Sequence, residues 1–129
     1  MREPRESPIS VLKAEFFRVL GHPIRVRILE LLREGERNVG ELETALQLDS
    51  GNVSQHLGAL RKQGILESRR AGTSVYYRVK DPRMFQLLEV ARQLLTSSLE
   101  ETQALLENLA AAAPDGDPVK RQDPKNRYS

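Results

Sequence analysis

A mainly α-helical domain with one small β-hairpin is predicted from the hydrophobic pattern of the chain. Apolar residues recur at helical spacing through most of residues 8–64, and they do so again after Asp81. Between these regions, the runs "ILESRR" and "SVYYRV" have the composition and alternation of short strands. These patterns predict five helices, with the hairpin between the fourth and the fifth.

The length and composition of the chain limit the kinds of protein that it can be. A chain of 129 residues can bury one core, so we expect one domain over residues 8–113 and disordered tails over residues 1–7 and 114–129. The sequence contains no long apolar run and no signal-peptide pattern, which predicts neither a membrane span nor secretion. The absence of cysteine fits a cytoplasmic protein and excludes disulfides, thiolate metal sites and thiol nucleophiles.

Start and stop signals define the first three helices. Openings are indicated at Ser7-Pro8, His22-Pro23 and Asn38, and helix ends at Gly21 and Gly35. Glu41, three residues after Asn38, completes a capping-box pattern for the short third helix. The segment "QLDSG" is then a tight turn into the fourth helix, with Asp49 or Ser50 as its N-cap.

The fourth helix, "SGNVSQHLGALRKQG" over residues 50–64, has two contrasting faces. Val53, Leu57 and Leu60 fall on one narrow stripe, as in a helix packed on a core. Gln55 and Lys62 point away from that stripe, and no acidic residue lies in the segment. A face of this kind donates and accepts hydrogen bonds, whereas an ordinary solvated face is rich in Glu–Lys pairs.

The last helix begins at Asp81-Pro82 and is expected to run for roughly 30 residues, more than a small domain can bury by itself. Its leucines therefore predict a second copy of the chain as partner. Acidic residues on this helix, such as Glu100, are expected to form its solvated face. The predicted dimer interface consists of Leu12, Phe16, Leu87, Leu88, Ala91, Leu94, Leu95 and Leu99.

Charge is distributed unevenly along the chain. Residues 50–80 hold six lysine or arginine residues and one acid, a net charge of +5. Residues 81–113 hold two basic and five acidic residues, a net charge of −3. The positive field is therefore concentrated on the fourth helix and the hairpin.

Helix, tight turn, helix and basic hairpin follow one another in the order of a winged helix-turn-helix domain. An α-helix about 10–12 Å across fits the major groove of B-DNA, where amide and hydroxyl side chains pair with base edges. Gln55 or Asn52 is suited to pair with adenine, and the basic residues are suited to contact phosphate. The predicted DNA-binding residues are Asn38, Ser50, Gly51, Asn52, Ser54, Gln55, His56, Arg61, Lys62, Arg69, Arg70 and Thr73.

The chain resembles the ArsR/SmtB family of winged-helix transcriptional regulators over about residues 10–110. The resemblance is carried by "VLGHPIRVRILELL", by "NVGELETALQLDSGNVSQHLGALRKQGILESRRAGTSVYYRV" and by the long last helix. It implies a homodimer built from the first and last helices, with two recognition helices in successive major grooves of an inverted-repeat operator. It also implies a repressor that an inducer releases.

The usual metal ligands of that family are missing here. Its Cys-x-Cys pair is matched by Asn38 and Gly40, and no histidine follows His56 to form the site on the last helix. No cofactor is therefore predicted. His22 and His56 are expected to have structural or DNA-contacting roles, and a weak divalent-metal site involving either one is left open.

Two other classes of function are an enzyme and a protein-binding module. An enzyme is not expected, since no nucleophile–base pair, phosphate-binding loop or paired-carboxylate cleft is evident. A winged-helix module or co-regulator that binds another protein through the Gln55 face is the main alternative. An unknown small-molecule, metal or protein effector stays open. At least one of Tyr76 and Tyr77 is expected in the core rather than stacked on bases.

Overall fold

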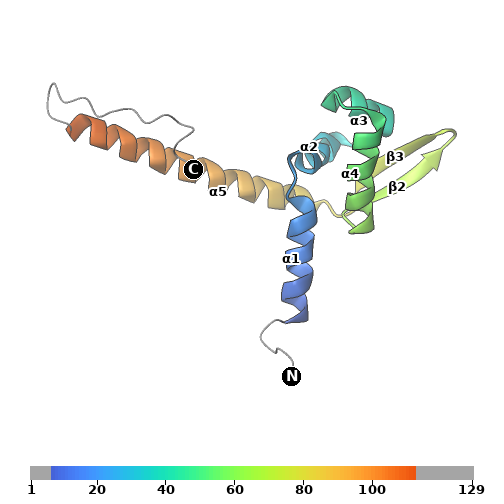
Figure 1. Ribbon diagram of the computed structural model, residues 1–129, viewed down its shortest axis with the longest axis horizontal. Coiled ribbons are helices and arrows are strands. Elements are labelled where there is room, and N and C mark those ends of the chain that lie inside the picture. The colour runs from blue at the N-terminus through green and yellow to red at the C-terminus, as the bar shows by residue number, and fades with distance from the viewer. Residues whose placement is uncertain (1–6, 113–129) are drawn as a thin grey trace. The chain divides into compact units, whose positions relative to one another are not determined.

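The structure is a computed structural model that describes residues 7–112. Its elements, in chain order, are α1 (Pro8–Leu20), α2 (Pro23–Leu31), the 3₁₀ turn η1 (Leu32–Glu34), β1 (Arg37–Asn38), α3 (Val39–Leu46), α4 (Ser50–Lys62), β2 (Leu66–Ala71), β3 (Ser74–Val79) and α5 (Arg83–Ala112) (Figure 1). The described residues divide into two units, residues 7–88 and 89–112, and α5 begins in the first and continues in the second. The expected mainly helical fold with a small hairpin is confirmed.

The predicted tails fall almost entirely outside the described residues. Within the predicted N-terminal tail, only Ser7 is described, and its side chain accepts a hydrogen bond from the Ser10 backbone as the N-cap of α1. None of the residues predicted to form the C-terminal tail belongs to the described range. The domain boundaries expected from the sequence therefore remain predictions.

The predicted caps are present at the starts of α2, α3 and α4. His22 Nδ1 accepts a hydrogen bond from the Ile24 backbone, at 3.1 Å, and Asp49 caps α4. α2 ends earlier than expected, because the chain tightens into η1 before reaching Gly35. Gln47, with a φ of 57°, turns the chain from α3 toward α4 in a left-handed conformation that is uncommon for residues other than glycine.

The sheet has three strands rather than the predicted two. β2 and β3 form the expected antiparallel hairpin, and Gly72 in its turn has a φ of 64° that favours glycine. β1 pairs with the other edge of β3, giving the strand order β1-β3-β2. A strand of only two residues leaves no alternation to detect, which is why the sequence did not indicate it. The hairpin projects from the helices beside α4 (Figure 1).

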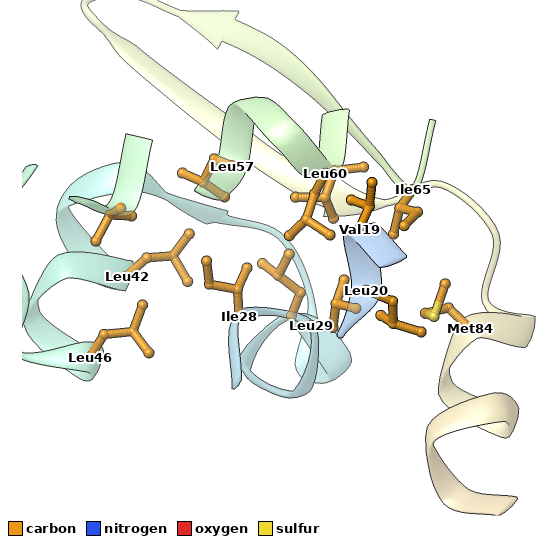
Figure 2. Close-up of a cluster of buried hydrophobic side chains, with 13 residues drawn as sticks. Val19, Leu20, Ile28, Leu29, Leu42, Leu46, Leu57, Leu60, Ile65 and Met84 are labelled. Carbon is orange, nitrogen blue, oxygen red and sulfur yellow. The ribbon is translucent and has the colours of Figure 1, made fainter. Parts of the chain in front are cut away.

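The core of the first unit joins all of its helices to the sheet. Its buried side chains are Val19, Leu20, Ile28, Leu29, Leu32, Leu42, Leu46, Val53, Leu57, Leu60, Ile65, Leu66 and Met84. Figure 2 shows Ile28 and Leu29 of α2 between Leu57 and Leu60 of α4 on one side and the neighbouring core residues on the others. Val53, Leu57 and Leu60 have no exposed surface, so the predicted apolar stripe of α4 is fully buried.

Large apolar side chains remain exposed in each unit. In the first unit they lie on α1, where Leu12 is 62% exposed. In the second unit they lie along α5, where Leu94, Leu95 and Leu99 are 66–68% exposed. No helix among residues 7–112 is both long and apolar enough to cross a membrane.

Replacing Leu57 by alanine is expected to lower the free energy of unfolding by about 2–5 kcal/mol, because the change leaves a cavity in a fully buried site. Urea denaturation followed by circular dichroism measures the loss. Glu30→Ala, at an exposed position of α2, is the control and should change the unfolding free energy by less than about 0.5 kcal/mol. A loss of similar size in both variants would contradict the packing described for α4.

Candidate nucleic-acid interface

The outward face of α4 carries most of the predicted base-reading residues. The structure exposes Ser50, Gly51, Asn52, Ser54, Gln55, Arg61 and Lys62. Asp49 caps the helix by accepting from the Asn52 backbone, and the Asn52 side-chain amide donates to the same carboxylate at 3.3 Å. Gln55 has no hydrogen-bond partner within the described part of the chain. Its amide is therefore the freer of the two to pair bidentately with a base.

The predicted contact between His56 and DNA requires correction. Although it lies next to Gln55 in sequence, His56 is only 9% exposed. Its ring packs on that of His22, with 4.4 Å between the ring centroids, and its Nδ1 accepts a hydrogen bond from Arg25 Nε at 3.1 Å. The side chain is therefore part of the contact between α4 and α2, and it is absent from the face of α4 that could meet DNA.

Asn38, a predicted DNA contact, lies at the N-cap of α3. Its side chain accepts from the Glu41 backbone at 2.8 Å, while its own backbone N–H donates to the Glu41 carboxylate at 2.9 Å. This is the capping box predicted from the sequence, and it pairs the backbone N–H groups of Asn38 and Glu41. The carboxylate of Glu41 also places negative charge at the start of α3, where it repels phosphate.

The two arginines of the wing have different surroundings. Arg69 donates to the carboxylate of Glu36 and lies over the ring of Tyr76, 4.8 Å from its centroid. The hydrogen bond from this guanidinium lowers the pKa of Glu36 and raises the pKa of Arg69. Arg70 follows on the opposite face of β2 and makes no ion pair among residues 7–112. Arg70 is therefore the arginine of this strand that is free to meet a phosphate.

The charge count of the sequence overstates the free positive charge of this region. Arg78 pairs with Glu67 across the hairpin at 2.5 Å, just as Arg69 pairs with Glu36. Within residues 50–80, the basic residues without an ion pair in the described part of the chain are Arg61, Lys62, Arg70 and Lys80. Thr73, another residue predicted to contact DNA, is exposed in the turn of the hairpin.

Tyr76, Tyr77, His22 and His56 contact other residues of the fold. Tyr77 packs against the core, as expected for at least one of the pair, and Tyr76 supports Arg69. Within residues 7–112, no three histidine or acidic side chains gather as metal ligands would. The Nδ1 atoms of His22 and His56 already accept hydrogen bonds, and the cation of Arg25 lies beside them. That charge disfavours the weak divalent-metal site left open at these histidines.

A family model described as "Bacterial regulatory protein, arsR family" matches residues 22–68, which span α2 to the start of the wing. The HTH-type transcriptional regulator Rv0081 of Mycobacterium tuberculosis is 48% identical over 105 residues, covering 81% of this chain and 92% of that protein. The crystal structure of Rv0081 aligns with a TM-score of 0.70 and 46% identity, covering 75% of this chain and 98% of that one.

Two further proteins are similar to most of the winged-helix region of this chain. The homodimeric winged helix-turn-helix domain of Mycobacterium bovis Mb0332 aligns with a TM-score of 0.67 and 30% identity, covering 78% of this chain and 93% of that one. The biofilm growth-associated repressor of Xylella fastidiosa is 39% identical over 75 residues, covering 58% of this chain and 66% of that protein. The chain thus belongs to the arsR family of bacterial regulatory proteins, and it is a winged helix-turn-helix transcriptional regulator rather than an enzyme.

Proposed function

We propose that the protein represses transcription by binding an inverted-repeat DNA site as a homodimer. The observation that carries this proposal is the exposed, hydrogen-bonding face of α4 around Gln55, whose opposite side is fully buried. A helix held in this way presents the same side chains to every DNA molecule that it meets. The description of the Xylella relative as a repressor supports repression, and the proposed site of action is the cytoplasm.

The exposed leucines of α5 and the apolar residues of α1 support the homodimer. A pair of copies related by twofold symmetry would bury these side chains, which are unfavourable in water. The homodimer described for Mb0332 supports the same assembly. Two symmetry-related α4 helices about 34 Å apart would then enter successive major grooves, which requires a DNA site with inverted symmetry.

The functional test is selection of genomic DNA fragments by the purified protein, repeated with and without added divalent metals. The proposal expects the recovered fragments to share an inverted repeat with half-sites about one helical turn apart. The rival protein-binding module would enrich no fragment above background. Enrichment that depends on added metal would identify a metal effector, and enrichment that does not change with metal would exclude the metals tested as effectors.

Truncation of Gln55 to alanine is expected to weaken binding to the selected site by about 1–3 kcal/mol and to relax base preference at one position of each half-site. The physical reason is the loss of a bidentate amide–base pair. Competition binding against site variants measures both effects. Gln86→Ala, which removes an exposed amide from α5, serves as the matched control. An unchanged base preference in Gln55→Ala would remove this residue from direct readout.

Arg70→Ala is expected to weaken binding to all DNA sequences and to reduce the slope of log affinity against log salt by about 1 for each phosphate that the arginine neutralises. Arg69→Ala is the matched comparison and should leave the slope nearly unchanged, because Glu36 already neutralises Arg69. Fluorescence anisotropy over a salt series measures both slopes. A larger change for Arg69→Ala than for Arg70→Ala would reverse the assignment made from the ion pairs.

Leu95→Glu is expected to convert the dimer to a monomer and to abolish site-specific DNA binding, because it places a charge in the proposed apolar interface. Sedimentation equilibrium gives the mass, and circular dichroism checks that the helices persist. Gln86→Glu introduces the same charge at an exposed polar position of α5 and should remain dimeric. A dimeric Leu95→Glu variant would show that this leucine lies outside the interface.

A further inference from the structure

A small polar cluster inside the first unit joins three helices. Arg25, on α2, donates through Nε to His56 Nδ1 on α4, at 3.1 Å, and through Nη1 to the backbone carbonyl of Val19 near the end of α1, at 2.9 Å. His22, the N-cap of α2, packs its ring on that of His56. One half-buried arginine thus connects the helix that bears the DNA-facing surface to both α1 and α2.

The hydrogen bonds determine where the imidazole protons lie. A nitrogen that accepts a hydrogen bond carries no proton, so Nδ1 of His56, which accepts from Arg25, is unprotonated and the ring proton of the neutral imidazole lies on Nε2. An imidazolium has N–H donors on both nitrogens and accepts at neither. Protonation of His56 would therefore turn its Nδ1 from a partner of Arg25 Nε into a second donor that faces it.

The charges around His56 oppose its protonation. Burial lowers the pKa of His56, and His22 and Arg25 lower it further. The nearest acid of α1, Glu15, is paired with Arg18 at 2.5 Å. Within residues 7–112, the two groups that lower the pKa of His56 besides its burial are both basic: Arg25 of α2, which is charged, and the N-cap residue His22, which repels a proton on His56 only when it is itself protonated. A proton on His56 would thus meet only repulsion, and relief requires the ring or Arg25 to move.

We propose that the Arg25–His56 hydrogen bond positions α4 for DNA binding, and that a proton on His56 breaks this bond and releases the DNA. This inference rests on the proposed function, since it concerns the same surface of α4. Arg25 and His56 act as positioning residues, because neither reaches the exposed face around Gln55. The device would make DNA binding sensitive to acid without any metal or small-molecule effector.

The sign of the pH effect separates this proposal from a direct contact. A histidine that touches a phosphate gains attraction when it is protonated, so acid would strengthen DNA binding. A histidine that must accept from Arg25 loses its bond, so acid weakens binding. The effect is readable because His22 and His56 are the only histidines of the chain, and no other side chain ordinarily titrates between about pH 5 and 8.

The experiment measures the affinity of the full chain for its selected DNA site from about pH 7.5 to about pH 5 at constant salt. Wild-type affinity is expected to fall with acid, and because the proposed homodimer carries two copies of His56, the fall approaches about a hundredfold per pH unit once the pH is below the pKa of His56. Circular dichroism at each pH checks that the helices persist. A flat profile, an affinity that rises with acid, or loss of the helical signal together with the binding would overturn the proposal.

Two variants test whether the loss of DNA affinity in acid comes from the imidazole of His56. In His56→Gln, the side-chain oxygen accepts from Arg25 but does not titrate, so binding should no longer vary over this pH range. In His22→Asn, an amide preserves the cap of α2 while the other histidine is removed, so the loss of affinity in acid should persist. The proposal fails if His56→Gln keeps the wild-type pH profile, or if His22→Asn loses it.

Nitrogen NMR of the wild-type imidazoles tests the Arg25–His56 hydrogen bond without relying on DNA binding. At neutral pH the His56 spectrum should report an unprotonated Nδ1 and a protonated Nε2, and the reverse tautomer would overturn the inference even where DNA is bound. Absence of sequence-specific DNA binding at neutral pH would instead refute the proposed function. In that case the NMR result would still test whether His56 Nδ1 accepts a hydrogen bond from Arg25.

Discussion

Burial of the apolar stripe of α4 is the constraint from which the rest of the molecule follows. Val53, Leu57 and Leu60 are fully enclosed by α2, α3 and the sheet, so α4 has only one rotation about its axis that leaves no cavity. That rotation turns Gln55 and its small polar neighbours toward solvent. The surface available for recognition is thus set by hydrophobic packing on the far side of the same helix.

Polar contacts between residues far apart in the sequence then determine which of the exposed polar side chains remain available to bind a ligand. Glu36 pairs with the exposed Arg69 and offsets its charge, and Arg25 holds the buried imidazole of His56. Formal charge therefore differs from the charge that a ligand would meet. In a domain this small, a few such pairs decide which cations remain for binding.

Local rules predicted most of this structure. Proline, glycine and capping residues located the helix boundaries, and helical periodicity identified the buried and exposed sides of α4. The two-residue β1 carried no pattern, and the pairs Arg69–Glu36 and Arg25–His56 join residues 33 and 31 positions apart. No local rule brings such residues together. The misassignment of His56 arose because it lies at the edge of the apolar stripe, where periodicity alone does not separate core from surface.

The starts of α3 and α4 each carry a carboxylate, Glu41 in the first turn of α3 and Asp49 at the N-cap of α4. Helix starts commonly attract anions, so acidic groups there reduce the attraction for polyanions of any sequence. The genome offers a vast excess of unrelated DNA, and the occupancy of a target depends on the ratio of specific to non-specific affinity. These two acids would weaken non-specific binding to chromosomal DNA. Fewer molecules of the regulator per cell would then suffice to keep its target site occupied.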